Sequence, residues 1–518
     1  MVRGPGEINA RLVVYGAAVL AALFRFPGLL YPLGSDESGF TLVAREWNPQ
    51  PDSLYGTYWV DRPPTLVALI KVSDDIGGPY FIRLVAVVAC VALVILSAAT
   101  ARALLRYAGE TDERFVTRTG AWTAILAATF TSTSMIDPIM AKGEILGIPF
   151  VLASFYLALR ALTRPRTDVR ALVLAFGAGV TAVLAQGMKQ NLVSGLVFGA
   201  ALLIGSRLAH RITPNEFLRL GGAALVGAAV PVVGTILWAM EAGVELDTLW
   251  YAIYGFRSDG LDVIAGAGKS GPLLRGLLLL GIALGTGAAF ILGGVLVHLR
   301  RIWQLNRTLT VAAGLVVTVD GLALLLGGSF WRPYLFAIVP GVVLCTALLL
   351  AVRDKVAQRA RALVVAAAVV SVLATGIWTA IDLAGLAGSD AHRAGVALGR
   401  AAEPGDTVVV YGGRAEIVLA GGLSSPYEHL WSLPMRTLDP DLTELQSVLS
   451  GPNAPTWFVW WVPPSAWGGM GEVLEPLLDE RYRPHGETCG DKPVYLRADV
   501  ERPPLRLRCS RTTIFYAD

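Results

Sequence analysis

The sequence is poor in charge and in cysteine, and each shortage excludes a class of protein. Only 16% of the 518 residues are charged while 54% are apolar, and the mean hydropathy is +0.56, so the chain is too apolar for a soluble domain of this size. Four cysteines are too few for a disulfide-stapled scaffold. The net charge of +3 gives no indication of a nucleic-acid partner, and we expect none.

Long apolar runs fill most of the chain instead. They recur through residues 1–384 at about 20 residues each, the length that crosses a hydrocarbon core of about 30 Å. No small-residue cleavage site follows the first run, which we expect to be an uncleaved signal anchor. The sequence therefore predicts a polytopic α-helical membrane protein with about eleven transmembrane helices, near residues 11–31, 80–101, 119–136, 144–160, 170–187, 191–207, 220–240, 273–298, 309–328, 332–352 and 361–384.

Basic residues concentrate in every second loop between these spans. Short loops rich in Lys and Arg stay in the cytoplasm, so the pattern places the amino terminus inside and, with an odd number of spans, the carboxyl terminus outside the plasma membrane. The basic residues concerned are Arg102, Arg106, Arg114, Arg118, Arg160, Arg164, Arg166, Arg170, Arg207, Arg211, Arg219, Arg300, Arg301, Arg307, Arg353, Lys355, Arg359 and Arg361.

From about residue 385 the pattern changes to short strands alternating with helices. TVVVY and TWFVWWV are typical of buried strands, and KPVYLRA and RTTIFYA predict further short ones. We expect residues 385–518 to form an extracytoplasmic α/β domain with a partly parallel sheet, without a glycine fingerprint for nucleotide phosphates. Cys489 and Cys509 lie in this outer domain, where oxidising conditions favour a disulfide, whereas Cys90 and Cys345 lie within spans as packing residues.

The outer segment 32–79, between the first two spans, is rich in polar chemistry. FTLVAREW and PTLVALIKV have the periodicity of amphipathic helices at a membrane interface. Between them, WVDRPP forms an extended turn that presents Asp61 and Arg62. An arginine held in this way can form a bidentate fork to a phosphate, although a lone arginine also snorkels to lipid headgroups.

Further polar residues fall on the same outer side of the predicted topology. Ionisable groups near membrane depth are costly and usually mark a site or a pairing, although outer loops also hold solvated charges. Arg25, near the outer end of the first span, fits either a site or interhelical packing. An acid facing a basic phosphate clamp indicates group transfer from a lipid phosphate. The residues concerned are Asp36, Glu37, Asp61, Arg62, Asp137, Lys142, Glu144, Lys189, Gln190, Asn191, Arg332 and Tyr334.

Several of these stretches resemble membrane glycosyltransferases of the GT-C type, in particular protein O-mannosyltransferases and lipid A aminoarabinose transferases. The resemblance covers about residues 10–350 and is carried by the Asp36-Glu37 pair, the helix after it and Arg62-Pro63-Pro64. Weaker matches are SMIDPIMAKGEILGIPFVLASFYLAL, GMKQN and SFWRPYLFAIVP. The chain departs from the last pattern, because Pro333 stands where relatives often have His before Tyr334.

The resemblance implies a GT-C fold and an inverting transfer of a sugar from a polyprenyl-phosphate donor to a hydroxyl of an envelope glycan, lipid or protein. It implies that Asp36 is the general base, that Glu37 supports its geometry, and that Arg62 binds the donor phosphate with Lys189 and Arg332. Asp137 would line the substrate pocket, together with Asp61, Lys142, Glu144, Gln190, Asn191 and Tyr334. Mannose or arabinose would be the sugar by analogy.

Simpler roles remain open for several of these residues. Glu37 could cap a helix, Lys142 and Glu144 could pair, and Gln190 and Asn191 could satisfy the backbone at a span boundary. No cofactor is indicated with certainty: a divalent cation at Asp61 stays open, but two carboxylates without histidine do not define a metal site. The alternative function is a transporter or flippase for lipid-linked glycans, against which stand the lack of an internal repeat and the location of the polar groups at span ends.

Overall fold

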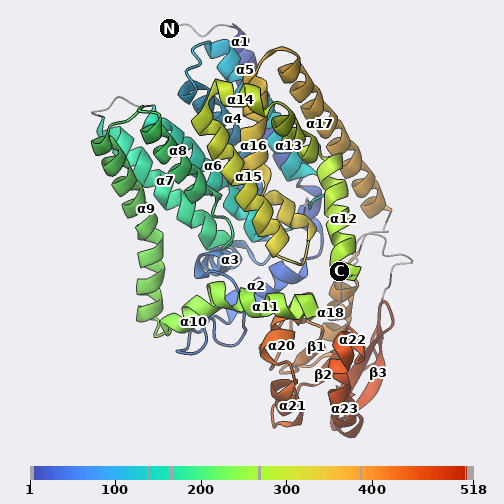
Figure 1. Cartoon of the computed structure of the whole chain (residues 1–518). Helices are drawn as coiled ribbons and strands as arrows, with labels where there is room; N and C mark the ends of the chain where they lie inside the picture. Colours follow the sequence, from blue (N-terminus) through green and yellow to red (C-terminus); the bar gives the residue numbers. More distant parts are fainter. Residues whose placement is uncertain are drawn as a thin grey trace.

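The computed structural model describes residues 5–137, 139–163, 168–266, 270–384, 388–507 and 509. A bundle of long helices occupies one end of the molecule, and a small sheet with short helices lies at the other (Figure 1). Helices α2 (Ser35–Arg45), α3 (Pro64–Gly77), α10 (Leu246–Trp250) and α11 (Phe256–Gly266) lie between the two (Figure 1). We call the end of the bundle that faces the sheet the domain end, and the opposite end the basic end.

The bundle is built from apolar helices that follow the predicted spans. They are α1 (Pro5–Leu23) with the 3-10 turn η1 (Pro27–Leu30), α4 (Phe81–Tyr107), α5 (Glu113–Ser132), α6 (Gly143–Leu162), α7 (Val169–Met188), α8 (Ser194–Leu208), α9 (Pro214–Glu241), α12 (Ser270–Gly285), α13 (Ala288–Val297), α14 (Leu299–Leu305), α15 (Arg307–Leu326), η3 (Arg332–Phe336) with α16 (Val339–Ala351), and α17 (Asp354–Leu383).

The polytopic membrane fold is confirmed, although the spans are less regular than predicted. Among the described residues, eight helices are long and apolar enough to cross a membrane, or ten if each of two bent pairs counts as one span. The predicted span 273–298 is wrong as one helix: α12 and α13 are separated at Gly287, whose positive φ of 81° breaks the helix. The predicted span 191–207 is a helix of only 15 residues, α8.

The loops at the basic end are held to one another by ion pairs. Arg353, which precedes α17, pairs with Glu110 of the α4–α5 loop at 2.6 Å, and Arg301 of α14 pairs with Asp354 at 2.9 Å. Arg211, between α8 and α9, donates to the backbone oxygen of Tyr107 at 2.8 Å. The loops that the sequence marks as basic therefore meet at one end of the bundle (Figure 1). Arg164 and Arg166 lie outside the described residues.

The predicted spans 220–240 and 273–298 leave the segment 241–272 as a loop, but most of this segment is helical. α10 continues through the π turn Tyr251–Gly255 (η2) into α11, and these elements run across the domain end (Figure 1). Aromatic side chains fix this course: Trp59 of the outer segment packs on Phe256 at 4.4 Å between ring centroids. The predicted interfacial helices of segment 32–79 are present as α2 and α3.

The sheet is four-stranded and partly parallel, as predicted. Its strands are β1 (Val408–Tyr411), β2 (Trp457–Trp460), β3 (Tyr482–Thr488) and β4 (Lys492–Arg497), in the order β1-β2-β4-β3. β1 and β2 pair in parallel, and β4 is antiparallel to both β2 and β3. β3 was not anticipated, and the predicted strand RTTIFYA lies outside the described residues. Short helices connect and cover the strands: α18 (Asp390–Ala401), α19 (Ala415–Gly421), α20 (Ser432–Leu438), α21 (Thr443–Ser450), α22 (Ala466–Gly469), η4 (Met470–Leu474) and α23 (Glu475–Arg481).

Both faces of the central strands are buried, which explains why they consist of apolar residues without alternation. Val408 and Val410 join the core that is continuous with the helical bundle, whereas Val409 and Tyr411 point into a second core on the other face. β2 divides its side chains between the same two cores. The sheet domain thus packs against the bundle through one face, which fixes its position over the domain end.

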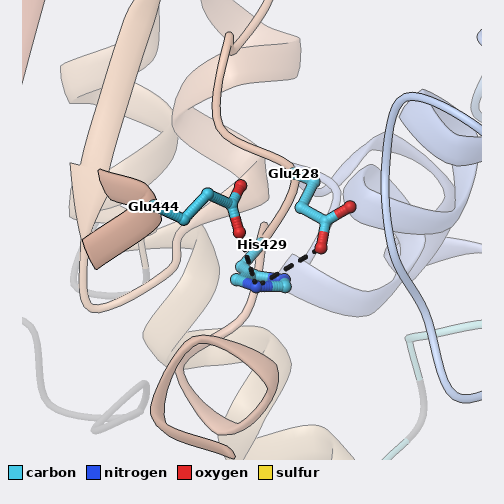
Figure 2. Close-up of side chains that lie close together, drawn as sticks. All are labelled: Glu428, His429 and Glu444. Carbon is cyan, nitrogen blue, oxygen red and sulfur yellow. Dashed lines mark ion pairs between the residues drawn. The ribbon is translucent and has the colours of Figure 1, made fainter. Parts of the chain in front are cut away.

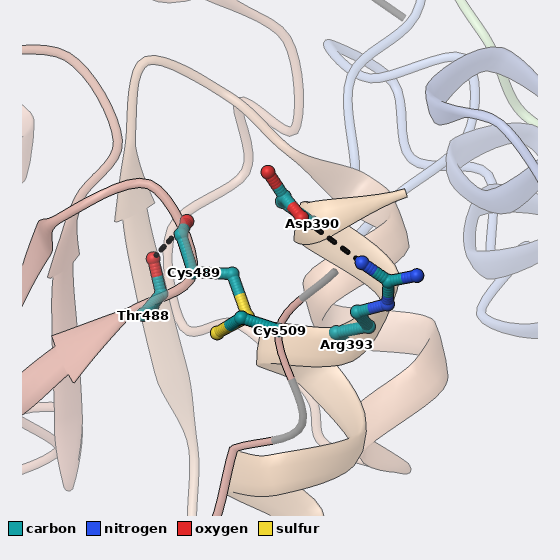
Figure 3. The surroundings of a disulfide bond; sticks show 5 residues. All are labelled: Asp390, Arg393, Thr488, Cys489 and Cys509. Carbon is teal, nitrogen blue, oxygen red and sulfur yellow. Dashed lines mark hydrogen bonds and ion pairs between the residues drawn. A yellow bond between two sulfur atoms is a disulfide. The ribbon is translucent and has the colours of Figure 1, made fainter. Parts of the chain in front are cut away.

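Cys489 and Cys509 form a disulfide in the structure (Figure 3). The bond ties the C-terminal segment to the end of β3, close to the ion pair between Asp390 and Arg393 of α18 (Figure 3). Cys90 and Cys345 are free and buried in the bundle. Disulfides persist in oxidising compartments, and the orientation of the chain in the membrane stays a prediction.

We expect a membrane-impermeant maleimide to label the two ends of the molecule from opposite sides of the membrane. In intact cells it should modify Asp441→Cys, on the exposed surface of the sheet domain, and should modify His210→Cys at the basic end only after permeabilisation. The native cysteines give little background because two are buried and two form the disulfide. Labelling of His210→Cys but not Asp441→Cys in intact cells would contradict the predicted orientation.

Candidate active site

The acidic pair after the first span begins helix α2. Gly34 is the N-cap residue, and Asp36 and Glu37 occupy the first turn, where carboxylates are stabilised by the exposed N–H groups of the helix. The two side chains have different surroundings. Glu37 is 2% exposed, whereas the side chain of Asp36 retains 28% of its accessible surface. The structure thus separates one anchoring acid from one accessible acid.

Glu37 is held by Arg83, which lies in the first turn of α4. Arg83 Nε and Nη2 donate to the two carboxylate oxygens at 2.9 and 2.7 Å, and the backbone N–H groups of Ala141 and Gly34 donate to the same oxygens at 2.8 and 3.2 Å. Burial opposes ionisation of Glu37, but Arg83 and these N–H groups keep its pKa below the usual value. Glu37 therefore caps α2, which is the simpler role that the sequence left open for it. It also fixes α2 against α4 and the segment before α6.

Asp36 faces a group of cations beside the sheet domain. Its carboxylate pairs with Lys142 at 3.2 Å and accepts a hydrogen bond at 3.2 Å from the indole of Trp431, a residue of the sheet domain. Burial would raise the pKa of Asp36, but the charges of Lys142, Arg62 and Lys189 outweigh it and lower the pKa to about 2. Asp36 is therefore ionised at every physiological pH.

The WVDRPP turn presents two arginines that share one carboxylate. Asp61 pairs with Arg62 at 2.5 Å and with Arg257 of α11 at 2.7 Å. Arg62 contacts this carboxylate through Nη1 and Arg257 through Nη2, and a guanidinium has five N–H donors, so donors remain for an anion. Because both arginines surround Asp61, its carboxylate does not fit a metal site.

A second ion pair joins the start of α6 to the end of α7. Lys189, which ends α7, pairs with Glu144 in the first turn of α6, and its ammonium lies 4.3 Å from the ring centroid of Tyr334. Gln190, the residue after Lys189, donates to the backbone oxygen of Asp61 at 3.1 Å and so connects this ion pair to the WVDRPP turn. Lys142 and Glu144 do not pair with each other, since Lys142 contacts Asp36 instead.

Other residues of the predicted site have different surroundings. Asp137 accepts from the backbone N–H groups of Ile139 and Met140, so its carboxylate stabilises a turn. Arg25 donates to the backbone oxygens of Thr131 and Met140, the interhelical packing role. Arg332 begins η3 and has no hydrogen bond or ion pair within the described residues. The side-chain oxygens of Asn191 and Gln190 are buried without a hydrogen-bond partner there.

Four residues of structural importance were not identified from the sequence. Arg83 and Asp320 lie within predicted spans. Asp320 is 2% exposed in α15 and accepts a hydrogen bond from the hydroxyl of Ser194. Its position inside α15 contradicts the expectation that polar groups lie at span ends. Arg257 fell in a presumed loop. Trp431 lies nearly 400 positions from Asp36, and no local pattern relates the two. For Arg83 and Asp320, the available signal in the sequence is a charged residue inside an apolar run.

Solved structures with a similar fold exist, although neither a protein-family model nor a curated protein sequence matches the chain. ArnT from Cupriavidus metallidurans bound to undecaprenyl phosphate is similar over 95% of this chain and 98% of that one, with 14% identity and a TM-score of 0.62. An Archaeoglobus fulgidus oligosaccharyltransferase tethered to an acceptor peptide is similar over 96% of this chain and 76% of that one, with 15% identity and a TM-score of 0.52. The oligosaccharyltransferase AglB from Archaeoglobus fulgidus, in complex with an inhibitory peptide and a dolichol-phosphate, is similar over 96% of this chain and 76% of that one, with 14% identity and a TM-score of 0.52. At these identities the likeness establishes the fold, which is of the GT-C type.

Removing the charge of Glu37 should destabilise the protein strongly. In Glu37→Gln the buried guanidinium of Arg83 loses its counter-charge, which typically costs about 3–5 kcal/mol. The matched control is Asp75→Asn, which removes a carboxylate from an exposed pair with Lys71 and should cost at most about 1 kcal/mol. Thermal unfolding of the purified variants measures the difference, and equal midpoints for the two would refute the anchoring role of Glu37.

Proposed function

We propose that this chain, which has the GT-C fold of membrane glycosyltransferases, transfers a sugar from a polyprenyl-phosphate donor to a hydroxyl acceptor of the cell envelope at the outer face of the plasma membrane. The observation that carries the proposal is the accessible carboxylate of Asp36 beside Lys142 and close to Arg62 and Lys189. The neighbouring structures with undecaprenyl phosphate and dolichol-phosphate support this class of donor.

In this proposal Asp36 accepts the proton of the acceptor hydroxyl. The acceptor oxygen forms a bond to the anomeric carbon as the bond from that carbon to the phosphate oxygen breaks, in a single displacement that inverts the configuration. The carboxylate thereby becomes neutral, and the leaving polyprenyl phosphate gains one negative charge. Negative charge thus moves from Asp36 to the phosphate, next to the same cations.

The phosphate would be bound by Arg62 and Arg257, with Lys189 as the third cation. Asp61 holds the two guanidinium groups side by side while leaving donors on each, which is an arrangement suited to a phosphate with several oxygens. Arg332 stays a predicted contact of the donor, without a contact to this group in the structure. Glu37 and Arg83 position α2 and do not touch the reacting atoms.

A transporter of lipid-linked glycans is the alternative. Asp320 in α15 and the break at Gly287 are a buried charge and a broken helix, which such proteins also use. However, Asp320 contacts Ser194 and none of the charged residues around Asp36. The concentration of cations about one accessible carboxylate favours group transfer.

Asp36→Asn should abolish transfer from a labelled polyprenyl-phosphate sugar without affecting expression or folding. Loss of a general base lowers kcat by roughly 10²–10⁴-fold.

Arg257→Ala should lower kcat/KM for the donor by roughly tenfold to a hundredfold, the value of a charge-assisted hydrogen bond. The control is Asp259→Asn, on the same helix as Arg257, because Asp259 accepts a hydrogen bond from the hydroxyl of Tyr251 and forms no ion pair within the described residues. If Asp36→Asn transferred the sugar like the unaltered protein, the catalytic assignment would be wrong.

The pH dependence offers a second test. With a pKa of about 2, Asp36 stays ionised as the pH falls, so it should impose no acidic limb on kcat/KM of the unaltered protein above about pH 4. In Lys142→Gln the main lowering charge is lost while burial still raises the pKa. As the pH falls, Asp36 should then become protonated at a higher pH than in the unaltered protein, so an acidic limb should appear in kcat/KM. Lys71→Gln, which alters an exposed lysine of α3, should leave the profile unchanged.

A further inference from the structure

A histidine and two glutamates that take no part in the proposed reaction meet in the sheet domain. Glu428 and His429 lie on the segment between α19 and α20, and Glu444 lies in the first turn of α21. Their side chains point toward one another (Figure 2). The Nε2 atom of His429 lies 3.4 Å from a carboxylate oxygen of Glu428 and 3.6 Å from one of Glu444.

The imidazole of His429 is buried without a hydrogen bond. The residue is 3% exposed, and neither ring nitrogen has a hydrogen-bond partner in the described part of the chain. The ring is held by edge packing against Tyr427, at 5.0 Å between centroids. Buried polar groups almost always have a partner, so an imidazole in this state indicates a ligand that completes its surroundings.

The two distances from His429 to the glutamates match the spacing of ligands in a zinc coordination sphere. Zinc binds nitrogen and oxygen ligands at about 2.0–2.2 Å, so two ligand atoms of one tetrahedron lie roughly 3.3–3.6 Å apart. The two distances from His429 Nε2 fall at this value, and all three ligand atoms lie within 4.8 Å of one another. Neither contact is a hydrogen bond, because both distances exceed the usual range of about 2.7–3.2 Å and neither ring nitrogen has a hydrogen-bond partner among the described residues.

The charge of the cluster also favours a cation. Neither Glu428 nor Glu444 has a lysine or arginine partner among the described residues. Asp439 adds a third carboxylate nearby, which accepts from the Tyr427 hydroxyl at 2.9 Å. The side chains of Glu428 and Glu444 are 34% and 44% exposed, so an ion can enter and a water molecule can complete the sphere.

We propose that Glu428, His429 and Glu444 bind a divalent transition-metal ion, for which zinc is the best fit. Imidazole nitrogen with two carboxylates suits zinc, whereas calcium and magnesium prefer six or more oxygen ligands. With three protein ligands, a water molecule takes the fourth position.

The ion would stabilise the contact between the sheet domain and the outer segment. Trp59 lies two residues before Asp61, and its backbone N–H donates to the backbone oxygen of Glu428 at 3.1 Å. In the other direction, Trp431 follows His429 by two residues and contacts Asp36. A metal at His429 therefore restrains the short segment that joins the WVDRPP turn to the accessible carboxylate.

Zinc binding to the purified, tag-free full-length protein tests the proposal independently of any activity. We expect one zinc ion per chain by elemental analysis after dialysis, and a rise of the unfolding temperature with zinc that a chelator reverses. His429→Gln and Glu444→Gln should each weaken binding by more than about 100-fold, because loss of even an outer partner of a metal ligand costs 10–100-fold. Calcium at the same concentration should not displace the zinc.

Two control variants test whether zinc binds at this cluster or at other side chains of the protein. His210→Gln, at the basic end, and Glu487→Gln, an exposed carboxylate on β3, should bind zinc like the unaltered protein. Absence of bound zinc in the unaltered protein, or equal affinity in His429→Gln and His210→Gln, would overturn the proposal. Either result would leave the proposed sugar transfer unaffected, because the binding assay uses no donor.

Discussion

The buried ion pair between Arg83 and Glu37 is the interaction on which the candidate site depends. All five N–H groups of Arg83 are used: they donate to both oxygens of Glu37 and to the backbone oxygens of Gly28, Tyr31 and Pro32. A buried charge costs several kcal/mol in desolvation, and only such complete hydrogen bonding offsets it. The pair fixes the end of the first span, the start of α2 and the start of α4 relative to one another.

With α2 fixed in this way, Asp36 projects toward the sheet domain. Gly39, one turn further on, lies so close to Trp431 that a Cβ atom there would be 2.2 Å from its indole. Phe40 packs against the same indole at 5.5 Å between centroids, and on the ring of Phe40 lies the guanidinium of Arg62 at 5.5 Å. The sheet domain is thus a wall of the candidate site, where Trp431 also hydrogen-bonds Asp36.

Much of the fold follows from local patterns in the sequence. Apolar length indicates the spans, the alternation of basic loops indicates which ends of the helices lie together, and period and turn residues indicate the strands of the sheet domain. Where the pattern was mixed, the predictions were wrong. The segment 241–272 has the polar residues of a loop, yet its aromatic side chains pack across the domain end as α10 and α11. The predicted span 273–298 is interrupted between α12 and α13 at Gly287, which has a left-handed conformation.

The sequence by itself determined that Asp36, Arg62, Lys142 and Lys189 lie at the same end of the bundle, because topology follows from hydrophobicity and charge. It could not determine which acid pairs with which base. Glu37 takes Arg83, Glu144 takes Lys189, and Asp61 takes both Arg62 and Arg257, which leaves Asp36 accessible beside Lys142. Only the tertiary structure decided this, because a pairing depends on distances of a few ångströms between residues that are far apart along the chain.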